Sequence, residues 1–183
     1  MNWDAIGAIG EIVGAIAVVT TLGYLAIQVR QSNASSNSVA IQAFFNSMET
    51  ISTGLIDQPK LRDAFGKGMN EWDTLSREEQ QLLHIYWGNF ATKLHMGFRL
   101  YKRGVLDEES WATWEAYFLS SLQTEGVRRW WEIAHPIYAD DFVTRIHTRI
   151  ADSDTLPPPI TETMPYFLDT STSTEKALSS DNP

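Results

Sequence analysis

Glu132 and His135 are three residues apart, which is the spacing used by helices that hold binuclear iron. Such a site needs two copies of this motif and further carboxylates, and this sequence offers one copy. His84 and His95 would lie about 16 Å apart along a helix, too far to share one ion. We therefore expect these residues to have surface or packing roles and predict no metal site.

Acidic residues occur in pairs at positions 108–109 and 140–141, where paired carboxylates could act as a general acid and base. Both pairs stand at expected helix starts, where acids complement the helix dipole, so capping explains them without catalysis. No G-x-S-x-G nucleophile sequence is present, and the Gly-Lys-Gly at 66–68 is too short for a phosphate-binding loop. The sequence therefore predicts no catalytic residue, no cofactor and no enzyme activity.

The overall charge and the missing cysteines exclude further classes. The formal net charge is −9, which argues against a nucleic-acid partner because that role needs a basic surface. The chain has no cysteine, which excludes disulfides, zinc–thiolate sites and iron–sulfur clusters.

One acidic residue, Glu11, lies inside a long apolar run. Residues 5–27 form this run of 23 positions, about 34 Å as a helix, which is enough to cross a hydrocarbon core of about 30 Å. Trp3 and Tyr24 flank it where aromatic rings favour the membrane interface. A cleaved signal peptide is the alternative, but no basic residue precedes the run and Glu11 interrupts it. We predict a transmembrane anchor over residues 1–31.

Small residues and Glu11 share one face of this predicted helix. Small side chains let two helices approach closely in lipid, where packing and interhelical hydrogen bonds drive association. A carboxylate at this depth costs several kcal/mol unless it is neutral, paired or hydrated. Glu11 therefore has three interpretations: a structural contact with another helix, a proton- or ion-linked site, or tolerance near the interface. The predicted membrane-helix interface consists of Gly7, Gly10, Glu11, Gly14, Ala17 and Thr21.

The Arg-Arg-Trp-Trp sequence from Arg128 to Trp131 is the most distinctive segment outside the span. In one interpretation Arg128, Arg129, Trp130 and Trp131 contact lipid headgroups or a partner protein. In the other, both Trp rings are core residues and the Arg stems pack over them.

Helical spacing and capping residues predict the elements that position these groups. A polar neck over residues 32–38 is either a flexible linker or an exposed part of a continuing helix. Residues 39–151 then carry only helical periodicity, including a capping box at Ser76 and Glu79 and a cap at Asp140. The predicted fold is all-α: one transmembrane helix, a small bundle of about five helices, and an extended or disordered tail over residues 152–183.

The stretch from Asn2 to Val19, with its Trp-Asp start and Gly-Glu-Ile-Val-Gly-Ala-Ile-Ala-Val-Val core, carries a family resemblance. Together with the Tyr-Leu-Ala-Ile-Gln-Val-Arg-Gln exit at 24–31, it resembles a family of short, uncharacterised bacterial single-pass membrane proteins. The Gly-Val-Arg-Arg-Trp-Trp segment at 126–131 is similar to their second half. The resemblance implies a helical protein anchored in the bacterial inner membrane and supplies no activity.

Asp4 before the span and Arg30 after it predict an N-terminus outside and a bundle in the cytoplasm, by the positive-inside rule. The expected partners are membrane lipid and, through the span, a second copy or other membrane subunits. We therefore expect a non-catalytic assembly protein, self-associating or an accessory subunit of a larger complex. The alternative is a membrane-tethered sensor or effector whose bundle binds a ligand or protein.

Overall fold

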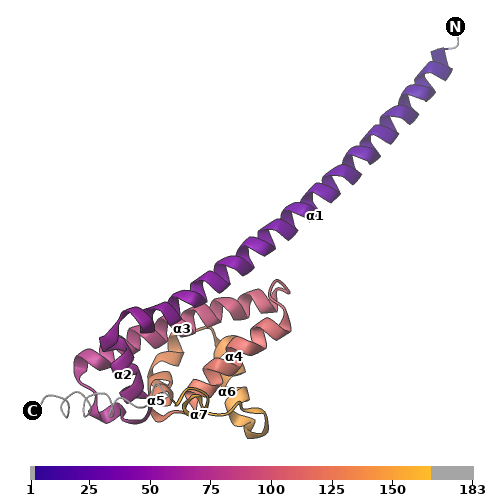
Figure 1. Cartoon of the computed structure of the whole chain (residues 1–183). Coiled ribbons are helices and arrows are strands. Elements are labelled where there is room, and N and C mark those ends of the chain that lie inside the picture. The colour runs from indigo at the N-terminus through magenta and orange to yellow at the C-terminus, as the bar shows by residue number, and fades with distance from the viewer. Residues whose placement is uncertain (1–2, 166–183) are drawn as a thin grey trace, which may run out of the picture. The chain divides into compact units, whose positions relative to one another are not determined.

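The structure is a computed structural model that describes residues 3–165, and among those residues it contains helices and no strand (Figure 1). The predicted all-α class is thus confirmed. The α-helices are α1 (Trp3–Asp57), α2 (Pro59–Asn70), α3 (Arg77–Lys102), α4 (Glu108–Leu122), α5 (Glu125–Ala134), α6 (Asp140–Ala151) and α7 (Ile160–Thr163). Short 3-10 helices lie between them: η1 (Trp72–Thr74), η2 (His135–Ile137) and η3 (Ser153–Thr155).

The chain divides into two units, Met1–Gln42 and Ala43–Pro183. The described part of the first unit is entirely α1, which continues through the polar neck without a break. Ser38 supports the helix there by donating its hydroxyl proton to the carbonyl oxygen of Ala34 at 3.1 Å. Of the two alternatives for residues 32–38, the structure therefore shows the continuing helix.

Residues 10–39 of α1 are all exposed. Large apolar side chains are among them, such as Val19, which is 69% exposed. Within the described residues, α1 is the one helix long and apolar enough to cross a membrane. The span predicted from the sequence therefore has the required length, composition and helical form.

Side-chain caps mark the starts of α3 and α4, whereas α2, α5, α6 and α7 begin without one. Ser76 and Glu79 form the predicted capping box at the start of α3, with hydrogen bonds of 3.2 and 2.7 Å. Gly104 follows the end of α3 with a φ of 68°, a conformation that glycine adopts without strain. Asp107 caps α4 by accepting from the Ser110 N–H at 2.8 Å.

The cap predicted at Asp140 is wrong by one position. The N-cap of α6 is Ala139, which has extended backbone and no side chain able to accept a hydrogen bond. Asp140 is instead the first helical residue, so its carboxylate follows the cap position. Asp141 accepts from the N–H of Phe142 at 2.9 Å, and both acids still complement the positive end of α6.

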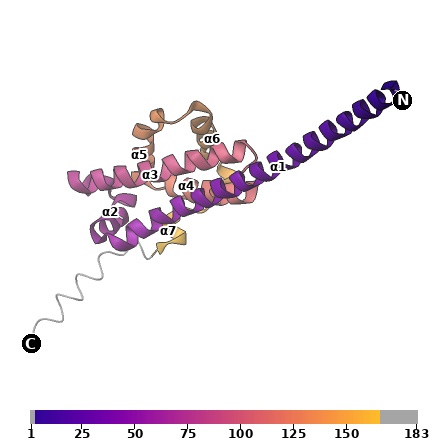
Figure 2. The same ribbon diagram turned by 90° about the horizontal axis from the view of Figure 1, so that it is seen from above.

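Aromatic side chains fill the core of the second unit. Helix α3 contacts α2, α4 and α5 (Figure 2) and contributes Trp87 and Phe90, which are 2% and 1% exposed. The last part of α1 adds a buried stripe at the helical spacing expected from the sequence, formed by Phe44, Met48, Ile51 and Leu55. Trp111, Trp130 and Phe142 are buried, Trp114 is half-buried, and Glu108 and Arg77 are exposed.

Two glycines bring α2 and α5 into close contact. A Cβ atom added to Gly126 of α5 would overlap the backbone carbonyl oxygen of Gly68 in α2. A Cβ atom added to Gly68 would overlap the side chain of Leu83 in α3. These glycines therefore permit a backbone approach that no other residue allows.

The segment from 152 to 165, predicted to belong to an extended tail, packs on the bundle. Ser120 and Gln123 of α4 donate to the carbonyl oxygens of Pro158 and Pro157 at 2.6 and 2.5 Å. Ile160 of α7 is buried. The bundle thus extends beyond the predicted boundary at residue 151, because prolines supply acceptors and Ile160 supplies apolar surface. The rest of the predicted tail, including Tyr166, Phe167 and Leu168, lies outside the described residues.

Candidate functional site

The predicted interface on α1 has no partner among residues 3–165. Gly7, Gly10 and Gly14 have nothing within 4 Å of the position where a Cβ atom would lie. Glu11 and Ala17 are exposed, and the continuous helix keeps the set at i, i+3 and i+4 spacing. The Thr21 hydroxyl donates to the carbonyl oxygen of Ala17 at 2.8 Å, so its proton is already used. Packing inside the chain therefore gives no reason for these glycines.

The structure selects between the two interpretations of residues 128–131. Trp130 and Trp131 are 1% and 3% exposed and belong to the core, so their rings are not available to headgroups or a partner. Arg129 forms ion pairs with Asp73 at 2.6 Å and with Glu125 at 2.7 Å. Arg128 is exposed. The contact site proposed for this segment is therefore corrected to two core tryptophans with arginines outside, because α5 turns its apolar face inward.

Sequence reasoning missed a buried charged cluster between α4 and α6. The Glu115 carboxylate is 3% exposed and accepts two hydrogen bonds from Arg145, at 2.6 Å from Nε and 2.9 Å from Nη2. Arg149 Nε lies 3.6 Å from the same carboxylate. The hydrogen bonds that Arg145 donates to Glu115 raise the pKa of Arg145. Both carboxylate oxygens are occupied, so this cluster ties two helices together and offers no free base.

A signal for this cluster was present in the sequence. Glu115 follows Trp111 by four residues and precedes Phe118 by three, so it occupies the apolar stripe of its helix. An acid at a core position requires a cation from another helix. The spacing of Arg145 and Arg149, four residues apart, fits one face of α6.

The histidines lie apart except for one pair. The rings of His135 and His147 are 5.2 Å apart between centroids, and Trp131 Nε1 donates to His147 Nε2 at 3.3 Å. Glu132 is exposed one turn earlier. In the part of the chain that the structure describes, no three His, Asp or Glu residues are grouped so as to hold a metal ion.

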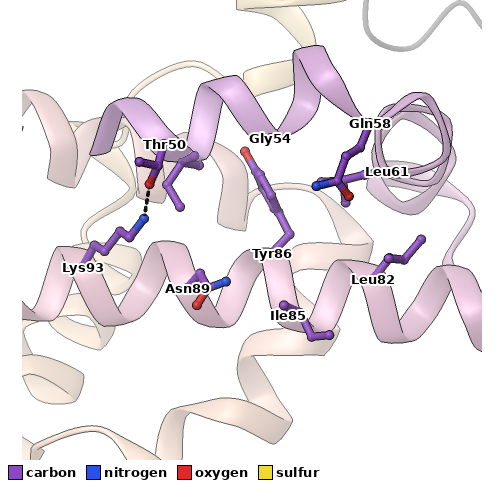
Figure 3. A pocket seen from close by; sticks show the side chains of 10 residues that line it. Thr50, Gly54, Gln58, Leu61, Leu82, Ile85, Tyr86, Asn89 and Lys93 are labelled. Atoms are coloured by element: carbon purple, nitrogen blue, oxygen red, sulfur yellow. Dashed lines mark hydrogen bonds between the residues drawn. The ribbon is translucent and has the colours of Figure 1, made fainter. Parts of the chain in front are cut away.

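A groove of about 210 Å³ lies between the end of α1 and α3 (Figure 3). Lys93 reaches across it, and its Nζ donates to Ser47 O at 2.7 Å and to Thr50 Oγ1 at 2.5 Å. Burial lowers the pKa of Lys93 and raises that of Tyr86. The groove thus combines an anchored amine and polar side chains with apolar walls. Its lining is Thr50, Ile51, Gly54, Gln58, Leu61, Leu82, Ile85, Tyr86, Asn89 and Lys93.

A second pocket, of about 420 Å³, lies at the C-terminal end of α3. Its lining is basic on one side and includes Ala139 and Asp141, at the start of α6, on the other. The basic side chains are His95, Arg99, Lys102 and Arg103. The helix dipole alone accounts for Lys102 and Arg103 near the end of α3, so local sequence reasoning does not reveal that they share a pocket with His95 and Arg99.

No family model, curated protein or solved structure matches the chain. Function is therefore inferred from the residues and their geometry.

Proposed function

We propose that this protein is a non-catalytic, single-pass protein of the bacterial inner membrane that assembles through α1. The partner is a second copy or another subunit of a larger membrane complex. The observation that carries this proposal is the exposure of every residue from 10 to 39, in a helix long and apolar enough to cross a membrane. A helix of this kind is stable where lipid or other helices cover it.

The glycines support contact with a helix in addition to lipid. Glycine inside a helix costs about 1 kcal/mol relative to alanine, and Gly7, Gly10 and Gly14 meet nothing in their own chain. A second helix lying against this face would use the space that they leave. Glu11 on the same face would then find a hydrogen-bonding partner away from acyl chains.

We expect Gly14→Ile to disrupt assembly, because the added side chain blocks the close approach of a second helix. Gly23→Ile is the matched control. It makes the same substitution nine residues later, on the opposite side of the helix, and its site is also free of contacts. The measurement is the mass of the complex purified from the native membrane in mild detergent.

Variants of Glu11 distinguish a structural contact from a proton- or ion-linked role, and the complex mass is again the measurement. Glu11→Gln retains a hydrogen-bonding group, so a structural contact predicts nearly normal assembly, whereas Glu11→Leu should weaken it. A proton- or ion-linked role predicts normal assembly of Glu11→Gln with loss of the linked function. An unchanged complex mass in both Gly14→Ile and Glu11→Leu, or a lone monomer for the native protein, would show that α1 is not an assembly interface.

We expect the bundle to lie in the cytoplasm, because Arg30 follows the span and no Lys or Arg precedes it within residues 1–4. A reporter fused after Asp152 should be active only in its cytoplasmic format. An Arg30→Glu variant should weaken this preference, and an Asp4→Asn variant should leave it unchanged. Activity of a periplasmic-format reporter at the native sequence would reverse the orientation.

A membrane-tethered sensor or effector is the second candidate, and the groove beside Lys93 favours it. Its mixed lining of apolar walls and a few polar groups is typical of small-molecule sites. Native mass spectrometry of the protein from its own membrane would detect a bound small molecule. A Lys93→Met variant should lose that molecule if the groove holds it, and retention would exclude the groove.

A further inference from the structure

The positive charge of this acidic protein is concentrated on α3. The chain has 23 Asp and Glu residues against 14 Lys and Arg, yet residues 80–106 include four Lys and Arg and no acid. Three of the four, Arg99, Lys102 and Arg103, line the pocket at the end of α3. This region therefore differs in sign from the rest of the molecule, and such a surface attracts anions.

Helical spacing directs these side chains to one pocket. His95, Arg99, Lys102 and Arg103 follow one another at i, i+4, i+7 and i+8, which is one face of α3. The pocket volume of about 420 Å³ lies within the usual range for small-molecule sites, about 300–1,000 Å³. The pocket can therefore admit a small anionic group together with part of the molecule that carries it.

Both arginines of the pocket lack a carboxylate partner among the described residues, as do the exposed Arg62, Arg77 and Arg128 outside it. Lys102 pairs with Asp141 at 2.5 Å, and other basic residues of the bundle, such as Arg129 and Arg145, also find carboxylates. Within the described residues, no carboxylate pairs with Arg99 or Arg103, although the protein has many more acids than bases. Their guanidinium groups remain available to a bound anion.

The opposite wall is the start of α6, which brings a helix N-terminus and the Asp141 carboxylate to the pocket. Ala139, the N-cap, gives no side-chain cap, and the N–H groups of Phe142 and Val143 bond to its carbonyl oxygen. A helix N-terminus carries about half a positive charge, and here it borders the same pocket as the arginines. Basic residues in the last turn of α3 complement the dipole of that helix. The dipole does not explain why these residues share a pocket with the start of α6.

We propose that the pocket formed by His95, Arg99, Lys102 and Arg103 binds a phosphate group, either on the headgroup of an anionic lipid or on a soluble phosphate compound. Guanidinium groups match phosphate oxygens in a two-pronged arrangement, so Arg99 and Arg103 are the principal ligands. Lys102 contributes charge while it remains paired with Asp141. This site is independent of the proposed assembly through α1.

The pKa of His95 can report the binding of phosphate, because this residue lines the pocket. Burial and the neighbouring Arg99 lower its pKa, whereas Asp141 of α6 opposes that shift, and its ring stacks on Phe142 at 5.1 Å between centroids. Tyr138 is the other ring against it. A bound phosphate places negative charge beside the imidazole and favours its protonated form, so binding should raise the pKa of His95.

The test is a pH titration of the four histidines by NMR in the whole chain, held in lipid nanodiscs of phosphatidylcholine, whose phosphate is balanced by its own choline cation. Inorganic phosphate is added against sodium chloride of the same ionic strength. We expect phosphate to raise the pKa of His95 and to leave His84, His135 and His147 unchanged. The phosphate dependence of that shift gives the affinity.

Charge-matched variants assign the effect to the pocket. The double variant Arg99→Gln with Arg103→Gln removes both guanidinium ligands and should weaken phosphate binding about tenfold or more. A tenfold loss of affinity corresponds to about 1.4 kcal/mol. Arg62→Gln with Arg77→Gln removes the same charge from exposed positions outside the pocket and should leave binding intact. Arg99→Lys with Arg103→Lys keeps the charge, loses the two-pronged geometry, and should give an intermediate affinity.

A second nanodisc composition distinguishes the two sources of phosphate. If a lipid headgroup is the ligand, phosphatidylglycerol in the nanodisc should raise the pKa of His95 without added phosphate. If a soluble compound is the ligand, only added phosphate should do so. The proposal is overturned if neither ligand shifts His95 more than chloride does. An equal loss in the Arg62 and Arg77 control would also overturn it, because the effect would then be general surface charge.

Discussion

Replacing Trp111 or Trp130 with alanine is expected to lower the free energy of unfolding by about 3–5 kcal/mol, the usual cost of truncating a buried aromatic residue. Trp111 is 0% exposed and Trp130 1%, and both are surrounded by other rings. Tyr101 stacks on Trp111 at 5.8 Å, and Trp130 lies 6.5 Å from Trp87, each measured between ring centroids. Alanine would leave a cavity at the meeting point of several helices.

Denaturant unfolding of the full chain in mild detergent, followed by tryptophan fluorescence and circular dichroism, measures this loss. Ile133→Ala is the control on α5, because Ile133 is 73% exposed and its truncation should cost under about 1 kcal/mol. The Nε1 atoms of Trp111 and Trp130 are buried and find no hydrogen-bond partner in residues 3–165. Phenylalanine at either site should therefore cost less than alanine, since it removes an unsatisfied donor and keeps a ring. Losses below about 1 kcal/mol for both alanine variants would place the core elsewhere.

Gly126→Ala is expected to destabilise the bundle by about 3 kcal/mol, at the upper end of the cost of overpacking a core. The added methyl group would overlap the backbone carbonyl oxygen of Gly68, which cannot move aside as a flexible side chain can. Relief requires α2 and α5 to separate, and this separation would disturb the neighbouring Trp130 and Trp72 contacts.

Gly88→Ala is the matched control for this substitution. Gly88 also lies inside a helix, α3, but a Cβ atom there would meet nothing within 4 Å. Alanine should stabilise the protein at this site by up to about 1 kcal/mol through helix propensity alone. In the same denaturant experiment, we therefore expect the free energy of unfolding to fall for Gly126→Ala and to rise for Gly88→Ala. Equal effects at the two sites would contradict the close α2–α5 contact.

Local features of the fold followed from the sequence because their causes are local. Ser76 and Glu79 satisfy backbone groups within one helical turn, and Asp107 does the same for α4, so neighbouring residues are enough to predict both starts. The spacing of Phe44, Met48, Ile51 and Leu55 likewise needs only a helical period. The cap predicted at Asp140 was wrong because two adjacent acids stand at the start of α6. The local sequence does not indicate which residue begins the first turn.

The sequence by itself determined the all-α class, the capped start of α3 and one helix with the length and composition to cross a membrane. Tertiary structure alone decided that Trp130 and Trp131 face inward, that Gly68 meets Gly126, and that Arg145 reaches Glu115. It also decided that the start of α6 borders the basic pocket of α3. Periodicity identifies an apolar face but not which helix covers it, and these contacts join residues 30 to 58 positions apart in different helices. Such pairings depend on the packing of all the helices at once, which no local pattern in the chain encodes.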